Sequence, residues 1–355
     1  MALAVGTIAG SIGMRGYDVA IMSIDRGDLD EGAVVALIGR RARQVSVVEG
    51  PIAAAVAALV LWQVPVVLLV SVVALSSAST GFLLLRAVNL RVSSGRRVLI
   101  ADCATAIVTL GGALVAFTRD AGAGGYVAAA CLGLVTGCFA ALVGRKTPVG
   151  PARGSEVEQV FSSLAGPAWW ARMFQTAAFR LDRVVLAAVG GVATAGVYAA
   201  VLPIAEMTTI VQLHMAQLVN AEIADAGGGR RWGSLLISRL AVVSSAMLAA
   251  AVIASAPQLI DLIYGPEFAG GATALRILTM ASVVSLLWRL AEAELFGRRA
   301  PSGAVSATVI AAVLTIGGTA LLGGIGAAAA SVASLVGYSA AFAVVLVSLR
   351  TVRRA

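Results

Sequence analysis

Long apolar runs alternate with short polar gaps along most of this sequence. Ten of the runs have about the length that a helix needs to cross a bilayer, and they lie at residues 47–62, 65–85, 98–117, 126–143, 161–190, 195–222, 235–256, 272–296, 304–322 and 326–349. An earlier apolar stretch, 2–14, is too short to span and is expected to be the end of a helix whose beginning is missing. The pattern predicts an all-α, polytopic membrane protein with about eleven membrane segments.

Basic residues gather in every second gap between these runs. They follow the first stretch at 40–43, occupy the gaps at 86–97, 145–153, 230–231 and 298–299, and close the chain at 350–354. Loops on the cytoplasmic side of a membrane carry an excess of lysine and arginine, so these gaps and the C-terminus are predicted to be cytoplasmic. Lys146 is the only lysine among 26 basic residues, a bias typical of a GC-rich bacterial genome, and we expect a bacterial cytoplasmic membrane.

The composition agrees with this class. Hydrophobic residues make up 59% and charged residues 12% of the 355 positions, and the mean hydropathy is +0.95. Soluble domains have roughly 45–50% apolar and 25% charged residues. The net charge of +8 would suit nucleic acid, but the placement of the arginines favours membrane topology, and no nucleic-acid partner is expected.

Cys103, Cys131 and Cys138 form no metal-ligand spacing with the single histidine, so no metal is expected.

The longest polar gap in the middle of the chain is a candidate boundary. Residues 144–160 are rich in proline, glycine and charge. We expect them to form a cytoplasmic linker between an N-terminal transmembrane lobe, 1–143, that lacks its first helix, and a C-terminal six-helix lobe, 161–355. The remaining gaps leave no room for a large soluble domain.

Charges within the run 161–190 are the chief candidates for function. Arg180, Asp182 and Arg183 lie in a segment apolar enough to cross a membrane, where charged side chains are costly and usually serve a task. On a helix, Arg172 and Arg183 are about 20° apart, and Arg180 is within about 80° of Arg172. The three arginines therefore share one face, whereas Asp182 lies on the opposite flank and could pair with a neighbour.

The run 195–222 carries a second polar stripe. Taken as one continuous helix, it places Glu206 and Gln217 about 20° apart and His214 about 80° from Glu206. Polar stripes that face each other on consecutive helices predict a water-exposed surface, because polar groups that face lipid would lack hydrogen-bond partners. Glu206 and His214 are therefore candidates for carrying a coupling proton. The alternative is that His214 only forms a hydrogen bond across a helix pair.

A third polar pair lies in the run 272–296. Arg289 and Glu292 have the i, i+3 spacing that allows an ion pair on a helix.

Three segments of the second half carry a family resemblance. They are RLDR at 180–183 followed by GVY at 196–198, PQLIDLIYG at 257–265 with Phe268, and GIGAAAA at 324–330. In order and spacing they resemble the lipid-linked polysaccharide flippases, the polysaccharide biosynthesis proteins of the multidrug/oligosaccharidyl-lipid/polysaccharide exporter superfamily. The first half is similar to this family by helix layout more than by motif.

The resemblance implies a transporter without covalent chemistry or a cofactor, and therefore not an enzyme. It implies two six-helix lobes around a central cavity that opens alternately to each side. The implied substrate is an isoprenoid lipid that carries an oligosaccharide through a (pyro)phosphate and moves from the cytoplasmic to the outer leaflet. Membrane lipids and the glycosyltransferases and polymerase of the same pathway are the implied partners.

Guanidinium groups match the geometry of phosphate oxygens, so the arginines are the expected contacts to such a substrate. The candidate substrate-binding residues are Arg172, Arg180, Arg183, Asp182 and Arg289. Alternatively, the arginines pair with Asp182, Glu206 or lipid phosphates and only hold helices together.

Two other functions remain open. A small-molecule or drug antiporter of the same superfamily, coupled to an ion, would favour a cavity dominated by carboxylates. A membrane glycan polymerase or ligase would need a sizeable external loop with catalytic side chains, and no predicted external gap is longer than about fifteen residues.

Overall fold

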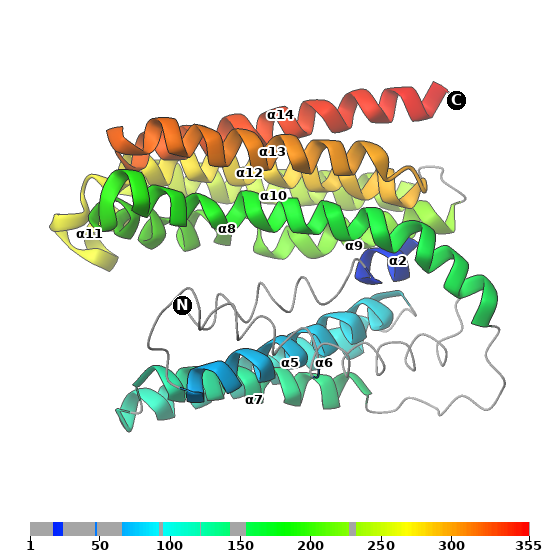
Figure 1. Ribbon diagram of the computed structural model, residues 1–355, viewed down its shortest axis with the longest axis horizontal. Coiled ribbons are helices and arrows are strands. Elements are labelled where there is room, and N and C mark those ends of the chain that lie inside the picture. The colour runs from blue at the N-terminus through cyan, green and yellow to red at the C-terminus, as the bar shows by residue number, and fades with distance from the viewer. Residues whose placement is uncertain are drawn as a thin grey trace. The chain divides into compact units, whose positions relative to one another are not determined.

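The computed structural model describes residues 17–23, 47, 66–91, 95–120, 122–142, 154–226 and 232–354. Every regular element in these ranges is helical (Figure 1). Eight helices in this part of the chain are long and apolar enough to cross a membrane. The structure confirms the predicted all-α, polytopic membrane fold.

Nine of the eleven predicted membrane segments fall on described helices: the helix Gly154–Met207 contains the run 161–190 and the first part of the run 195–222, and the helix Ile210–Asp225 contains most of the rest of that run. The other two, 2–14 and 47–62, lie outside the described residues apart from Val47. The same holds for the basic gap at 230–231.

The chain divides into two compact units, Met1–Trp169 and Trp170–Ala355. In the first unit, the short helix α2 (Tyr17–Ser23) precedes α5 (Val66–Arg91), α6 (Gly95–Thr118) and α7 (Gly122–Leu142). The long helix α8 (Gly154–Met207) begins in this unit and continues into the second. Residues 154–160 of the predicted linker are thus the first turns of α8, and 144–153 lie outside the described residues.

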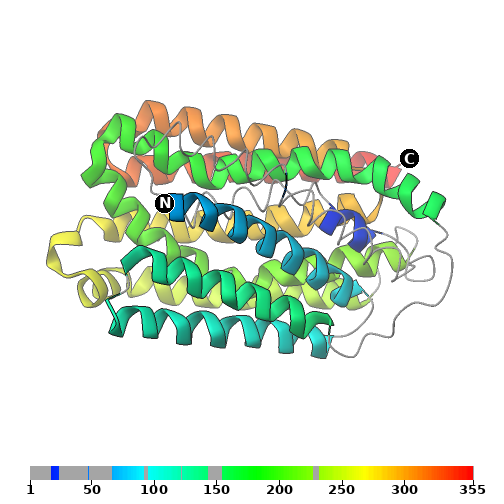
Figure 2. The same cartoon turned by 60° about the horizontal axis from the view of Figure 1, so that its bottom comes forward.

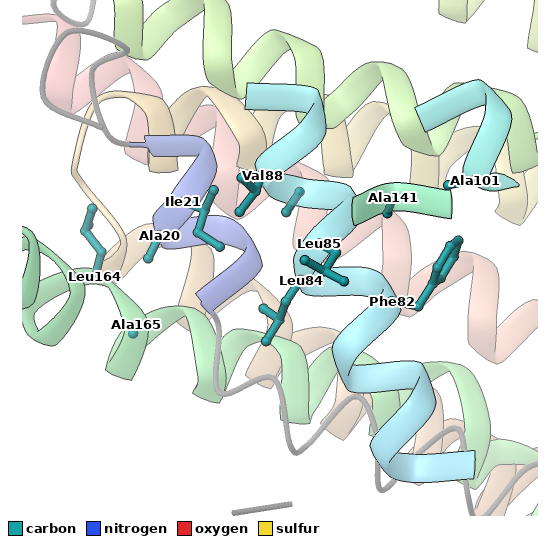
Figure 3. Close-up of a cluster of buried hydrophobic side chains, with 11 residues drawn as sticks. Ala20, Ile21, Phe82, Leu84, Leu85, Val88, Ala101, Ala141, Leu164 and Ala165 are labelled. Carbon is teal, nitrogen blue, oxygen red and sulfur yellow. The ribbon is translucent and has the colours of Figure 1, made fainter. Parts of the chain in front are cut away.

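A cluster of buried apolar side chains joins the elements of the first unit (Figure 3). Ile21 of α2, Leu84 of α5, Ala141 of α7 and Leu164 of α8 all belong to it. The predicted polar gap at 86–97 begins later than expected, because α5 continues to Arg91. The Nε atom of Arg86 lies 3.1 Å from Oδ1 and 3.2 Å from Oδ2 of Asp102 on α6, and this ion pair keeps Arg86 on the helix.

Glycines allow α6 and α7 to pack closely as an antiparallel pair, which Figure 2 shows as the cyan and teal helices. A Cβ atom on Gly112 would lie 2.8 Å from the Cβ of Ala129, and one on Gly133 would lie 2.8 Å from the carbonyl oxygen of Thr105. Small residues at a helix–helix contact are the usual device for close packing in lipid, where no hydrophobic effect drives association.

The second unit contains the remaining helices. After α8 come α9 (Ile210–Asp225), α10 (Trp232–Ala254), α11 (Ala256–Tyr264), α12 (Gly271–Gly297), α13 (Ser302–Leu322) and α14 (Ala327–Arg354). Short 3-10 turns, η2 (Pro266–Phe268) and η3 (Gly323–Ile325), precede α12 and α14. In Figures 1 and 2, α14 lies beside both α12 and α13.

The packing of α13 on α14 repeats that of α6 on α7. A Cβ atom on Gly318 would lie 2.7 Å from the Cβ of Ala333, and one on Gly337 would lie 3.1 Å from the carbonyl oxygen of Ala311 and close to Thr315. The sequence repeats with the contacts: Thr-x-Gly-Gly stands at 109–112 and again at 315–318, and Ala-x-x-x-Gly stands at 129–133 and again at 333–337. Each unit thus contains the same helical hairpin.

α8 turns back on itself at Gly191. Its 54 residues would extend about 80 Å if they were straight, far more than the roughly 30 Å of a hydrocarbon core. Gly191 has φ 80° and ψ 163°, a conformation that is strained for residues with a Cβ atom. The first half of α8 thus contains the predicted run 161–190, and its second half contains the first part of the run 195–222, which continues in the next helix. The break falls where the glycines at 190–196 indicated a turn.

Candidate functional site

A cluster of polar side chains lies within the membrane-spanning helices of the second unit. The cluster draws on both halves of α8, on α12 and on α14, and its members are Arg172, Gln175, Asp182, Arg183, Tyr198, Glu206, Arg289, Glu292, Ser334 and Tyr338. All of these elements belong to candidate membrane spans. Charged groups at this depth need partners or a functional reason to be there.

Asp182 is the most buried charged member, with 2% of its surface exposed. The hydroxyl of Tyr198, across the turn of α8, donates to its Oδ2 at 2.5 Å. The backbone N–H of Arg183 donates to its Oδ1 at 2.8 Å. The Tyr198 hydroxyl also lies 3.1 Å from the Ser334 hydroxyl of α14. The carboxylate therefore connects the two halves of α8 to each other and, through Tyr198, to α14.

Arg183 makes a second connection between the halves of α8. One of its terminal nitrogens lies 3.5 Å from Oε1 of Glu206, and both side chains are partly exposed. The Nε atom of Arg183 is buried and has no hydrogen-bond partner within the described residues. The guanidinium group of Arg183 thus forms one long ion pair, with Glu206, and still has an N–H group that can donate to a second anion.

Arg172 begins a polar chain from α8 to α12. Its Nη1 atom donates to the amide oxygen of Gln175 at 2.8 Å. The amide nitrogen of Gln175 donates in turn to Oε2 of Glu292 at 3.3 Å. Gln175 is almost fully buried, so this chain crosses the interior of the unit and does not face lipid.

Arg289 lies against an aromatic cluster. Its guanidinium carbon is 4.6 Å from the centroid of the Phe179 ring, a cation–π geometry. Phe179, Trp288 and Tyr338 have ring centroids 4.8–6.1 Å apart. The Nε atom of Arg289 is buried and has no hydrogen-bond partner in the described part of the chain. Arg172 and Glu206 lie within electrostatic range of this guanidinium.

The structure brings five of the seven predicted site residues into this cluster. They are Arg172, Asp182, Arg183, Glu206 and Arg289. Arg180 is partly buried on the same uninterrupted half of α8. His214 lies on α9, and its side chain is outside what the structure describes.

The prediction that Glu206, His214 and Gln217 share a stripe on one continuous helix was wrong, because the helix is interrupted between Glu206 and His214. α8 ends at Met207, and α9 begins at Ile210. The hydroxyls of Thr208 and Thr209 donate to the carbonyl oxygens of Ala205 and Glu206, which also accept hydrogen bonds from the backbone N–H groups of the same two threonines at the break.

The sequence reasoning missed the roles of several neutral residues. Gln175, Ser334 and Tyr338 were not singled out, and Tyr198 was noted only as part of a motif. A buried amide three positions after Arg172 was a usable signal, because residues at i and i+3 are neighbours on a helix. The partnership of Tyr198 with Asp182 had no sequence signal, since it depends on the turn at Gly191.

The first unit holds a smaller polar group. It consists of the Arg86–Asp102 ion pair and of Asn89, whose amide nitrogen donates to the carbonyl oxygen of Ala141 at 3.1 Å. These contacts join α5 to α6 and α7. Among the described residues, no group of three or more histidine, cysteine and acidic side chains could hold a metal ion.

Solved structures share the architecture described above. The chain is similar over 99% of its length to a crystal structure of MATE in the straight conformation, with a TM-score of 0.76, 16% sequence identity and 86% of that chain covered. An outward-facing multidrug resistance MATE family transporter of the MOP superfamily has a TM-score of 0.73 at 16% identity, with 99% of this chain and 85% of that chain covered. The chain has the fold of these transporters.

A third structure with this fold is a MOP superfamily transporter from Pyrococcus furiosus. Its binding pocket has a reverse polarity that suggests a different function for it. The TM-score is 0.73 at 17% identity, with 99% of this chain and 85% of that chain covered. No protein-family model and no curated protein matches the sequence. The superfamily fold expected from the three sequence motifs is thus supported, whereas the narrower flippase family stays a prediction.

Proposed function

We propose that this protein is a flippase that moves an isoprenoid-(pyro)phosphate-linked oligosaccharide from the cytoplasmic to the outer leaflet of a bacterial membrane. The main support for this proposal is the set of arginines inside the second unit. The Nε atoms of two of them, Arg183 and Arg289, are buried donors without a hydrogen-bond partner among the described residues. A phosphate or pyrophosphate group offers the several acceptors that such guanidinium groups need.

The fold supports alternating access as the proposed transport mechanism. Transporters built from repeated lobes commonly rock around a central site, and each unit of this chain contains the same glycine-packed hairpin. In this mechanism the substrate phosphate competes with Glu206 for Arg183. The present ion pair is 3.5 Å long and partly exposed, so its loss costs about 0–1 kcal/mol.

Replacing Arg180 or Arg183 by alanine tests the proposal in cells. Because Arg183 contributes little to stability and much to binding, we expect normal amounts of membrane protein and a strong loss of complementation in a strain deleted for the gene. Arg239→Ala is the matched control, since Arg239 is exposed on α10 and outside the cluster. Full complementation by both Arg180→Ala and Arg183→Ala would reject the proposal.

A drug antiporter is the second candidate function. It is favoured by the MATE structures that share the fold and by Asp182, Glu206 and Glu292, whose carboxylates lie in the same cluster. The Pyrococcus furiosus transporter is a precedent for this fold with a changed pocket polarity. Export of cationic drugs that depends on these carboxylates and survives Arg183→Ala would favour the antiporter.

Ion coupling is a separate part of the proposal and rests on Glu206 and His214. Glu206 pairs with Arg183, so a proton on this carboxylate would release the arginine for substrate. Histidine titrates near neutral pH and is the natural second carrier. We expect His214→Ala to flatten the pH dependence of transport between about pH 6 and 8, measured in vesicles with an imposed gradient. An unchanged pH profile would remove His214 from the mechanism.

A further inference from the structure

The segment between α10 and α12 is a short helix with an unusual surface. α11 has nine residues, so it is about 13 Å long and cannot cross a membrane. It nevertheless exposes two large apolar side chains, Leu262 at 83% and Ile263 at 52%. This segment includes the PQLIDLIYG motif at 257–265, and it contributes nothing to the polar cluster.

The side chains of α11 fall into three sectors. With about 100° per residue, Ala256 and Tyr264 lie within about 40° of the fully buried Ile260. Asp261 and Gln258 lie about 100° to 160° from Ile260 and are exposed. Leu262, Leu259 and Ile263 follow at about 200°, 260° and 300°. The helix thus has one face toward the protein, one polar face and one apolar face.

The protein-facing sector fixes the rotation of the helix. Ile260 and Ala256 belong to a buried cluster with Val201 of α8 and Leu275 of α12. The Tyr264 hydroxyl donates to the carbonyl oxygen of Ala200 at 2.7 Å. α11 therefore cannot turn to bury Leu262 without breaking these contacts.

The end of the motif closes the helix against the same surface. The Tyr264 ring lies 5.5 Å from that of Phe268, centroid to centroid. Gly265 caps the helix with φ 87°, and its N–H donates to the carbonyl oxygen of Asp261 at 3.0 Å. The glycine, the tyrosine and the phenylalanine of the motif are thus explained by this turn.

The apolar sector continues the membrane-facing surface of its neighbours. α11 follows α10 directly, and α10 is a candidate membrane span that exposes Met247 and Leu248. It leads through η2 into α12, a second candidate span. A helix that joins the ends of two spans lies at the boundary between hydrocarbon and water.

We infer that α11 is an interfacial helix that binds the phospholipid bilayer, with Leu259, Leu262 and Ile263 at the level of the upper acyl chains and Gln258 and Asp261 among the headgroups and water. Amphipathic helices of this kind insert their apolar face about 5–10 Å below the headgroups. A protein partner fits less well, because a stable protein interface buries about 800 Å² on each side and α11 exposes only a narrow apolar strip. The inference does not rest on the proposed transport function.

Spin labels at two exposed positions test this placement. In a full-length protein with Cys103, Cys131 and Cys138 replaced by alanine, Leu262→Cys and Gln258→Cys each carry a nitroxide, and both proteins are reconstituted in phosphatidylglycerol–phosphatidylethanolamine vesicles. Oxygen concentrates in the acyl region and a nickel chelate in water. The ratio of oxygen to nickel collision rates is expected to be severalfold higher at residue 262 than at residue 258.

Three other outcomes contradict the inference. Equally low ratios at the two positions would place the whole of α11 in water. Protection of residue 262 from both reagents would indicate a protein contact in place of lipid. A high ratio at both positions would mean that the polar sector also lies in hydrocarbon. Each labelled protein must elute as a single species and unfold at the temperature of the unlabelled protein, so that the readout reports the folded state.

Discussion

Asp182 has its partners at positions that no local pattern connects to it. Tyr198 reaches it from 16 residues later along α8, and Ser334 joins from α14, 136 residues beyond Tyr198. A buried carboxylate is stable only when its oxygens accept hydrogen bonds. Tyr198 therefore stabilises the folded second unit by satisfying Asp182, and the pair ties the two halves of α8 together.

Tyr198→Phe removes the hydroxyl and leaves Oδ2 of Asp182 without this donor. Burial of an unsatisfied polar group costs about 1–3 kcal/mol, so we expect a lower unfolding temperature in detergent. Tyr126→Phe is the control, because Tyr126 is a partly exposed tyrosine of the first unit. In Asp182→Asn the same tyrosine substitution should cost less, as the lost bond is then to a neutral amide. Equal unfolding temperatures for wild type and Tyr198→Phe would show that the bond is not formed in the protein.

The α6–α7 and α13–α14 hairpins use the same residues at the same contacts. Gly133 packs on Thr105 and Thr109, and Gly337 packs on Ala311 and Thr315. Within each hairpin, a neighbouring glycine, Gly111 or Gly317, has open space where a Cβ atom would point. In both units the repeated Thr-x-Gly-Gly sequence thus places an open glycine, Gly111 or Gly317, directly before a packed one, Gly112 or Gly318.

Valine substitutions separate packing from helix propensity. Gly133→Val and Gly337→Val force side-chain atoms into the facing helix, and we expect each to destabilise its hairpin by about 1–3 kcal/mol or to prevent folding. Gly111→Val and Gly317→Val should change stability by less than about 1 kcal/mol, because valine is no worse than glycine within a helix. Thermal unfolding in detergent and the yield of monodisperse protein are the measurements. Similar losses at the packed and the open glycines would contradict the close-packed hairpins.

Helix positions were predictable from hydrophobic runs, but helix ends were not. α5 runs past its predicted end to Arg91, so Arg86, which pairs with Asp102 on α6, lies on a helix and not in a loop. α9 begins after a break at Thr208 and Thr209 that apolar composition does not reveal. The segment 257–271, predicted to be external, contains most of α11, whose nine residues are too few to register as a span.

The charged residues of the candidate site could be predicted from the sequence, but the hydrogen bonds that join them to other helices could not. An arginine or aspartate within an apolar run stands out in a sequence, and Arg172, Asp182, Arg183, Glu206 and Arg289 were found in this way. Neutral partners such as Ser334 stand out less, because an uncharged hydroxyl interrupts an apolar run less clearly than a charge does. Their roles follow only when α8 has turned at Gly191 and α12 and α14 have packed against it.

The molecule as a whole combines the fold seen in the MATE structures with a cluster of three arginines and three carboxylates in its second unit. Under the proposed function, the arginines of this cluster bind an anionic substrate. The cytoplasmic position of the C-terminus remains a prediction of the basic gaps. The central claim is that the arginines of α8 grip the phosphate of a lipid-linked sugar during its passage across the membrane.

Transbilayer movement of a labelled polyisoprenyl-pyrophosphate sugar in vesicles with the purified protein measures this claim directly. The fraction of sugar accessible to a membrane-impermeant reagent is followed with time. Wild type and Arg239→Ala should move the lipid well above protein-free vesicles, and Arg180→Ala and Arg183→Ala should be at least about tenfold slower, equivalent to about 1.4 kcal/mol. Wild-type protein that moves none of this lipid, or arginine variants that move it at the wild-type rate, would contradict the account.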